Sequence, residues 1–142
     1  MATTRNSTAN WEGSLLQGAG TVSLDSSGTG TFDVTWPSRA EEPNGRTSPE
    51  ELLGAAHATC FSMALSHGLS GAGNPPEHVR TRASVTFQPG EGITGIHLAV
   101  RATVPGISEE DFRRAAEDAK ANCPVSQALK GTEITLEAEL AG

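Results

Sequence analysis

One stretch of this chain predicts a helix with no polar side. From Leu52 to Leu69, Leu, Ala, Gly, Cys, Phe and Met recur on almost every face of the expected helix. Its start is clearly marked, because Ser48 is a fitting N-cap, Pro49 suits the first helical position and Glu51 has the spacing of a capping box. A helix that is apolar all round is buried on most of its sides. We therefore expect it to run through the middle of the fold, and in a chain of 142 residues a partner subunit is the economical means of covering it.

The rest of the chain alternates between short strands, one amphipathic helix and turns. Residues 37–47 have no periodicity and are rich in Pro, Gly and charge, so we expect them to form a long loop. The expected strands cover residues 10–13, 20–24, 31–36, 79–87, 93–104 and 133–140, a second helix covers 109–122, and a short helical turn covers 125–129. This order predicts an α+β fold with a largely antiparallel sheet, in one domain that spans residues 1–142.

Charge and hydropathy exclude several classes of partner. The formal net charge is −7, whereas nucleic acids and anionic membranes require a cationic face. No apolar run approaches the roughly 20 residues of a membrane span. Residues 1–12 are polar and lack the apolar stretch of a signal peptide. We therefore expect a cytoplasmic protein that binds neither nucleic acid nor membrane.

The two cysteines, Cys60 and Cys123, stand far apart in the sequence. A small secreted scaffold would carry a denser set of cysteines, and a zinc site would carry close pairs. The sequence therefore signals no metal, flavin or haem, and no cofactor is expected. In a reducing compartment two such cysteines are either inert buried thiols or a redox pair. At pH 7 only about 3% of an ordinary thiol is thiolate, and burial lowers that fraction further.

A redox role for Cys60 therefore requires a cation close to its sulfur. Arg39 and Arg46, in the expected loop before the apolar helix, are the candidates. A guanidinium favours the thiolate and can bind a peroxide oxygen, provided that a carboxylate holds its planar fork. Glu50 is the natural carboxylate, but it precedes Cys60 by ten residues, or ~15 Å along a helix. Either the arginine spans part of this gap, or the two helices of a dimer lie antiparallel and the partner subunit presents Arg39 and Glu50. We favour this second arrangement, a composite site.

His57 is the competing activator of Cys60. It stands three residues earlier and therefore on the same face of the expected helix, as in a cysteine–histidine hydrolase. Two groups on one rigid helix rarely have in-line geometry, and no Asn or Asp is evidently placed to orient the ring. A structural role for His57 is therefore favoured, and the remaining histidines show no ligand spacing with either cysteine.

Several motifs resemble the OsmC/Ohr family of thiol peroxidases. The run from Ser48 to Leu65, SPEELLGAAHATCFSMAL, resembles the core helix of that family, and Asn122 to Leu129, NCPVSQAL, resembles its second cysteine motif. Residues 9–13, ANWEG, and 104–107, VPGI, also match, so the resemblance spans nearly the whole chain. His57 in the helix and an arginine just before it are more similar to the osmotically inducible (OsmC) branch than to the organic hydroperoxide resistance (Ohr) branch.

The resemblance implies an intertwined homodimer, with two buried helices at its centre, sheets outside and active sites at the subunit interface. By position, Cys60 is the peroxidatic cysteine, Cys123 the resolving one, Glu50 the family's glutamate and Arg39 its arginine. The implied activity is reduction of organic hydroperoxides and hydrogen peroxide through a Cys60 sulfenic acid and a Cys60–Cys123 disulfide. A dithiol, in this family a lipoyl protein or a small dithiol, is the implied electron donor.

Two other functions stay open at this point. One is a dimer that binds a small hydrophobic ligand and carries inert thiols. The other is the Cys60–His57 hydrolase, which would be indifferent to Cys123. Oxidation by one equivalent of hydroperoxide separates the first from a peroxidase, because inert thiols would not be consumed.

Overall fold

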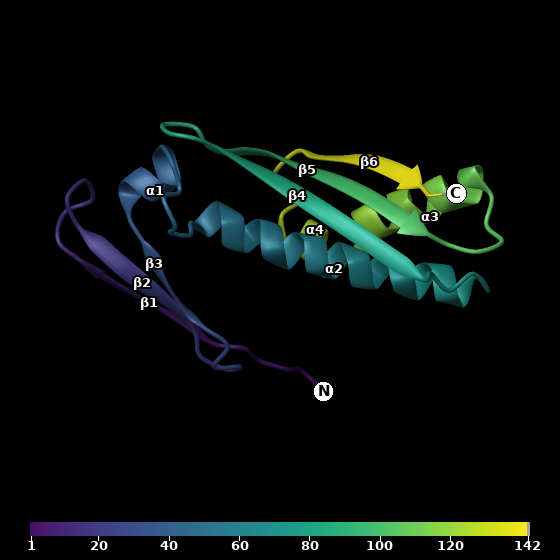
Figure 1. Cartoon of the computed structure of the whole chain (residues 1–142), viewed down its shortest axis with the longest axis horizontal. Coiled ribbons are helices and arrows are strands. Elements are labelled where there is room, and N and C mark those ends of the chain that lie inside the picture. The colour runs from purple at the N-terminus through teal and green to yellow at the C-terminus, as the bar shows by residue number, and fades with distance from the viewer. Residues whose placement is uncertain (142) are drawn as a thin grey trace. The chain divides into compact units, whose positions relative to one another are not determined.

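A computed structural model describes residues 1–141 of the chain. The chain divides into two compact units, Met1–Leu52 and the part that begins at Leu53. Among the residues described, no helix is both long and apolar enough to cross a membrane. The fold is α+β, as predicted, and Figure 1 labels its helices and strands.

The first unit contains a three-stranded antiparallel meander. Its strands are β1 (Ser7–Glu12), β2 (Ala19–Leu24) and β3 (Thr31–Val34), hydrogen-bonded in that order. Alternation of apolar and polar residues and the Gly- and Ser-rich turns predicted this arrangement. The predicted third strand was two residues too long, because it ends at Val34 rather than at residue 36.

A short helix, α1 (Trp36–Ala40), follows β3 where the sequence predicted an uninterrupted loop. Thr35 caps it reciprocally with Ser38: the Ser38 N–H donates to Thr35 Oγ1 over 3.1 Å, and the Thr35 N–H donates to Ser38 Oγ over 3.0 Å. Pro37 lies in the first turn, where backbone N–H groups have no acceptor within the helix, so its missing N–H costs no hydrogen bond. The loop prediction is therefore wrong for residues 37–40, and Arg39 lies in the last turn of a capped helix.

The long helix α2 (Pro49–Gly71) begins at the residue that the sequence predicted. The Glu51 N–H donates to Ser48 Oγ over 3.1 Å, while the Glu51 carboxylate accepts from the Thr47 hydroxyl over 2.6 Å. Within a single chain only one face of the helix is covered: Leu65 is fully buried, whereas Met63 is 68% exposed. The prediction of burial on most sides therefore requires something beyond this chain.

The second unit contains a mixed sheet of β4 (His78–Gln88), β5 (Gly92–Thr103) and β6 (Ile134–Leu140). Strands β4 and β5 pair antiparallel, but β5 and β6 pair parallel, with Ile96 opposite Ile134. The predicted antiparallel character thus fails for this pair. Parallel neighbours need a long crossover connection, and α3 (Glu109–Asn122) and α4 (Pro124–Ala128) supply it between β5 and β6.

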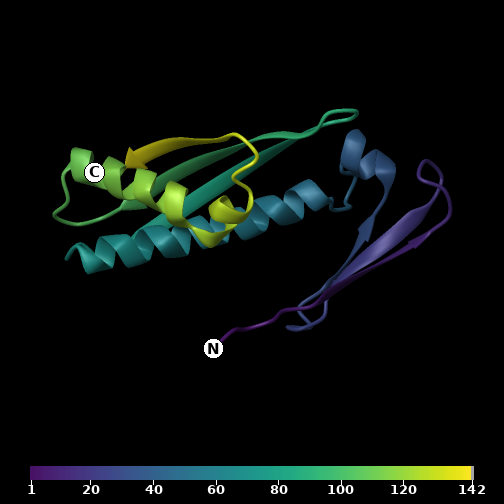
Figure 2. The ribbon, with the colours of Figure 1, turned by 180° about the vertical axis from the view of Figure 1, so that it is seen from behind.

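The core of this unit lies between one face of the sheet and two helices. Figures 1 and 2, seen from opposite sides, show α2 and α3 against this sheet. Leu98 of β5, Leu65 of α2 and Phe112 of α3 are all fully buried in one apolar cluster. Cys123 belongs to this cluster, and the half-buried Cys60 packs against it. The core therefore brings the two cysteines toward each other.

Candidate active site

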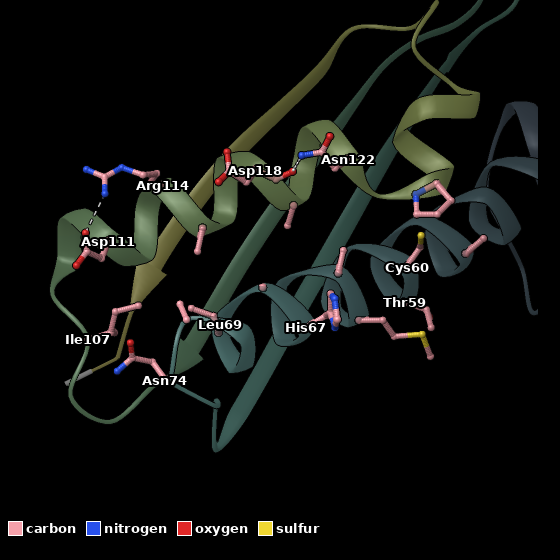
Figure 3. Close-up of a pocket in the computed structure, with 18 of the residues that line it drawn as sticks. Thr59, Cys60, His67, Leu69, Asn74, Ile107, Asp111, Arg114, Asp118 and Asn122 are labelled. Atoms are coloured by element: carbon pink, nitrogen blue, oxygen red, sulfur yellow. Dashed lines mark hydrogen bonds and ion pairs between the residues drawn. The ribbon is translucent and has the colours of Figure 1, made fainter.

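The two cysteines meet although they lie 63 residues apart (123 − 60). Helix α2 carries Cys60, and Cys123 stands at the junction of α3 and α4. Both are free thiols, and the Cys60 S–H donates a hydrogen bond to the Cys123 sulfur. In Figure 3 the Cys60 sulfur points from α2 toward the end of α3 near Asn122. Two sulfurs in hydrogen-bond contact are placed for disulfide formation after modest side-chain rotation.

The end of α3 determines the surroundings of Cys123. Pro124 opens α4, so Cys123 becomes its N-cap, and the Ser126 N–H donates to Cys123 Sγ over 3.4 Å. Burial by itself raises the pKa of Cys123. The N–H and hydroxyl of Ser126 and the thiol of Cys60 all donate to its sulfur, and together they bring the pKa of Cys123 below its usual value.

Cys60 has the opposite electrostatic setting. Burial raises the pKa of the Cys60 thiol; the Val125 N–H opposes that effect, and the neighbouring Cys123 sulfur adds to it. The result is a pKa above the usual range, and therefore less thiolate at neutral pH. With these contacts alone Cys123 ionises more readily than Cys60, so a reactive Cys60 requires a cation close to its sulfur as well.

Arg39 and Glu50 form a two-pronged ion pair within the first unit. Arg39 Nε donates to Glu50 Oε1 over 3.0 Å, and Arg39 Nη2 donates to Glu50 Oε2 over 2.9 Å. Glu50 is only 7% exposed, and the guanidinium lies 6.0 Å from the centre of the Trp36 ring. Arg46, the other candidate cation, is exposed and donates to the backbone oxygen of Asn44 over 3.5 Å. Glu50 therefore holds Arg39, and the fork of Arg39 has a fixed orientation.

His57 is fully buried on α2, and its hydrogen bond goes to Ser126 rather than to a cysteine. His57 Nε2 lies 2.7 Å from Ser126 Oγ, whereas His57 Nδ1 has no hydrogen-bond partner within residues 1–141. Burial lowers the pKa of His57, so its ring is neutral at pH 7. This geometry does not form a Cys60–His57 hydrolase pair.

A cavity of about 1220 Å³ opens between α2 and α3 beside Cys60. Figure 3 shows Cys60 and Thr59 toward one end of it, and Asn74, Ile107 and Asp111 at the other. Its surface is largely apolar near the sulfur, with contributions from Ala55, Ala56, Met63 and Ala64. A cavity of this size and lining accommodates a small organic molecule with its reactive group at Cys60.

Sequence reasoning missed Ser126, the residue that contacts both His57 and Cys123. A local signal was available, because Pro124 at the first helical position makes Cys123 the N-cap. The residue three places after an N-cap directs its N–H to the capping side chain. No local signal pointed to the contact with His57, which is 69 residues distant in the chain. No cluster of three or more metal-ligating residues lies among the residues that the structure describes.

Comparison with known proteins gives a consistent set of relatives. The family model for OsmC-like proteins matches residues 42–139. The chain is 46% identical over 135 residues to Peroxiredoxin OsmC of Escherichia coli (strain K12), covering 93% of each chain. It is 27% identical over 105 residues to an organic hydroperoxide resistance protein-like sequence of Mycoplasma pneumoniae, covering 70% of this chain and 72% of that one.

Solved structures show the same architecture. An OsmC-like protein from Mycoplasma pneumoniae superposes with a TM-score of 0.75 at 16% identity, covering 100% of both chains. An organic hydroperoxide resistance protein from Elizabethkingia anophelis gives a TM-score of 0.70 at 26% identity, covering 99% of this chain and 100% of that one. The fold and the family predicted from the sequence are therefore confirmed.

Proposed function

This chain belongs to the OsmC-like protein family, in its OsmC branch, and we propose that it reduces hydroperoxides with Cys60 as the attacking thiol and Cys123 as the resolving one. It is a thiol-dependent peroxidase, an oxidoreductase that acts on hydroperoxides. The observation that supports the assignment of the two cysteines is their shared hydrogen bond across separate helices. The largely apolar cavity beside Cys60 favours organic hydroperoxides, and hydrogen peroxide is small enough to enter as well.

In the first step the Cys60 thiolate attacks the terminal oxygen of the hydroperoxide. A sulfur–oxygen bond forms, the oxygen–oxygen bond breaks, and the departing alkoxide takes a proton to become the alcohol, or water when hydrogen peroxide is the substrate. Cys60 is oxidised to the sulfenic acid, and the peroxide is reduced.

The proposed activator of Cys60 is Arg39, which Glu50 orients. Burial raises the pKa of the Cys60 thiol, so the thiolate needs a neighbouring positive charge. The two-pronged pair with Glu50 fixes the plane of the guanidinium. In the proposed composite site this guanidinium stabilises both the thiolate and the charge that develops on the leaving oxygen.

In the second step Cys123 condenses with the sulfenic acid. A sulfur–sulfur bond forms, the hydroxyl group leaves as water, and Cys60 is protected from further oxidation. An external dithiol, of lipoyl or small-molecule type, restores both thiols by exchange and becomes a disulfide itself.

The proposed assembly is a homodimer in which the whole chain acts as one domain. The uncovered face of α2 supports this proposal, because Met63 is 68% exposed and its neighbours Ala55 and Ala56 are exposed too. A helix with apolar residues on all sides is stable in water when a second surface covers the remaining ones. A second copy of the chain offers the same apolar face and is self-complementary about a twofold axis.

Thiol titration tests the proposed function. We expect one equivalent of cumene hydroperoxide to consume both thiols of the reduced protein, and mass spectrometry to detect an intrachain Cys60–Cys123 link. Cys60→Ser should abolish peroxide consumption, and Cys123→Ser should allow one turnover and then stall as the sulfenic acid. If the titre of free thiols stayed unchanged, the protein would instead be a ligand-binding dimer with inert thiols.

A further inference from the structure

A buried chain of hydrogen bonds connects α2 to the sulfur of Cys123. His57 of α2 lies 2.7 Å from Ser126 Oγ, through its Nε2 atom. Ser126 in turn donates to Cys123 Sγ, through both its hydroxyl and its backbone N–H. All three side chains are buried, with exposed fractions of 0% for His57, 4% for Ser126 and 0% for Cys123. Water therefore does not compete for these bonds.

The unpaired nitrogen of His57 sets the direction of this chain. His57 Nδ1 is buried and has no partner among residues 1–141. A buried N–H group without an acceptor is rarer than a buried acceptor without a donor, so the hydrogen of the neutral ring is assigned to Nε2. The Nε2–H group then donates to Ser126 Oγ. Ser126 has a single hydroxyl hydrogen, and with its oxygen serving as acceptor that hydrogen is directed to the Cys123 sulfur.

The donors from Ser126 differ from the donor of Cys60 in one respect. In the reduced protein the Cys60 S–H group also donates to Cys123 Sγ. Oxidation of Cys60 removes that S–H group before the second step begins. The hydroxyl and N–H of Ser126 are not altered by the oxidation. Together with the backbone N–H of Val125, they remain as donors to Cys123 when it has to act.

We propose that His57 is a positioning residue for the resolving step: through Ser126 it keeps hydrogen-bond donors on the Cys123 sulfur and holds that sulfur toward Cys60 for the attack. The inference rests on the proposed function of the two cysteines. In the step itself the Cys123 thiolate attacks the sulfur of Cys60–SOH, the sulfur–sulfur bond forms and the sulfur–oxygen bond breaks. The hydroxide that leaves takes up the proton that Cys123 released, so one water is produced. The Cys60 sulfur is reduced and the Cys123 sulfur is oxidised.

Two substitutions of His57 separate this role from simple filling of the core. In His57→Gln the side-chain amide reaches the place of Nε2 and can donate to Ser126. In His57→Asn the amide ends near the place of Nδ1 and cannot reach it. A third variant, Ser126→Ala, removes the hydroxyl but keeps the backbone N–H. His97→Gln is the matched control, because His97 also contacts a hydroxyl over 2.7 Å, that of Thr135, but on the exposed face of the sheet.

The experiment is a single turnover: each variant is mixed rapidly with one equivalent of cumene hydroperoxide, and the rates of Cys60 oxidation and of disulfide formation are measured. We expect oxidation of Cys60 at the parent rate in every variant. Disulfide formation should be about tenfold slower in Ser126→Ala, since a hydrogen bond to a charged sulfur is lost. It should also be slower in His57→Asn, because the hydroxyl of Ser126 is then no longer held toward that sulfur. His57→Gln should retain the rate within about threefold, and His97→Gln should match the parent.

A second readout tests the state of the sulfur itself. In a Cys60→Ser background, thiolate absorbance against pH gives the pKa of Cys123, which should rise in His57→Asn and Ser126→Ala and stay near the parent value in His57→Gln. Ser126→Ala keeps the test decisive if His57→Asn does not fold. Parent-like rates and an unshifted pKa of Cys123 in folded Ser126→Ala would overturn the inference. Failure of the parent protein itself to form a disulfide would instead overturn the proposed function.

Discussion

At the scale of single residues, the two sulfurs are in contact and yet differ in their chemistry. Both sulfurs accept from the N–H of Val125, but Cys123 also accepts from Ser126 and Cys60, whereas burial dominates at Cys60. Hydrogen bonds to a sulfur favour its anion, and burial disfavours it. Cys60, the residue proposed to attack the peroxide, is thus the one whose thiolate most needs stabilisation by a positive charge. Arg39, aligned by Glu50, is the proposed source of that charge.

We expect Arg39→Lys to lower kcat/KM for cumene hydroperoxide by about 100-fold. A lysine keeps the charge but cannot form the two-pronged pair with Glu50, so the donors near the reacting oxygen lose their alignment. Arg46→Lys is the control, because Arg46 is exposed and donates to the backbone oxygen of Asn44. Equal losses in both variants, or a loss in Arg46→Lys alone, would contradict the assignment of Arg39.

The pH dependence of alkylation tests the same assignment from the side of the sulfur. In a Cys123→Ser background, Arg39→Ala removes the proposed guanidinium, and burial then outweighs the Val125 N–H and keeps the pKa of the Cys60 thiol above its usual value. The thiolate fraction at pH 7 then falls, and iodoacetamide should react more slowly than with Cys123→Ser alone. The rates should converge as the pH is raised above both pKa values. Identical pH profiles would remove the need for a guanidinium at Cys60.

The sequence allowed most of these residues to be named, and physical reasons explain the one that escaped. Cys60, Cys123, Arg39 and Glu50 each stand beside a local signal: a capped helix start, a proline after a cysteine, or a charge next to an apolar helix. Ser126 is a small polar residue, and nothing in the residues around it points to a contact with His57. Its importance comes from a contact with His57 that only the packed core creates.

At the scale of elements, the buried ring of His57 joins α2 to α4 and makes that contact sensitive to acid. Burial lowers the pKa of His57 below 6.5 in the folded state. Above pH 6.5 the His57 ring is neutral in both the folded and the unfolded chain, so it does not change the free energy of unfolding with pH. Below pH 6.5 the ring binds a proton in the unfolded chain but not in the folded one, so the free energy of unfolding falls by up to about 1.4 kcal/mol per pH unit.

Urea denaturation measures this effect. We expect the free energy of unfolding of the reduced protein to decrease between pH 6.5 and the lowered pKa of His57, and His57→Gln to flatten that part of the curve. His97→Gln, a change on the exposed face of the sheet, should leave the slope in place. If the slope of the free energy of unfolding against pH were unchanged in His57→Gln, other titrating groups would be its cause.

Two elements differ from the sequence-based expectation for reasons that patterns cannot convey. Alternation identifies a strand and its buried face, but it does not give the direction of its neighbour, so the parallel pairing of β6 with β5 was not foreseen. Helix α1 has five residues, too few for a 3.6-residue period to show. The reciprocal cap of Thr35 and Ser38 was the only cue, and it was hidden in the expected end of a strand.

At the scale of the whole molecule, the uncovered face of α2 predicts a dimer. The mass in solution should be twice the 14.7 kDa of one chain. Met63→Arg places a charge on that face and should shift the mass toward the single chain, since an unpaired charge in an interface is strongly disfavoured. Ser84→Arg, on the exposed side of β4, should remain dimeric. Light scattering after size exclusion distinguishes these outcomes.

The two compact units also raise the question of cooperativity. Both tryptophans, Trp11 and Trp36, belong to the first unit, whereas most of the helical residues belong to the second. If the chain acts as one domain, fluorescence and far-ultraviolet circular dichroism should report the same unfolding transition. Two separate midpoints would show that each unit unfolds independently.

The contact between Cys60 and Cys123 has a consequence for the lifetime of the protein. A covalent link there would close a loop of about 63 residues and restrict the unfolded chain by about 4 kcal/mol. A molecule that has just consumed a peroxide would therefore melt at a higher temperature and resist proteolysis longer than a reduced one. The disulfide-linked form would persist longer than the reduced form, and it would remain available for reduction when a dithiol is supplied again.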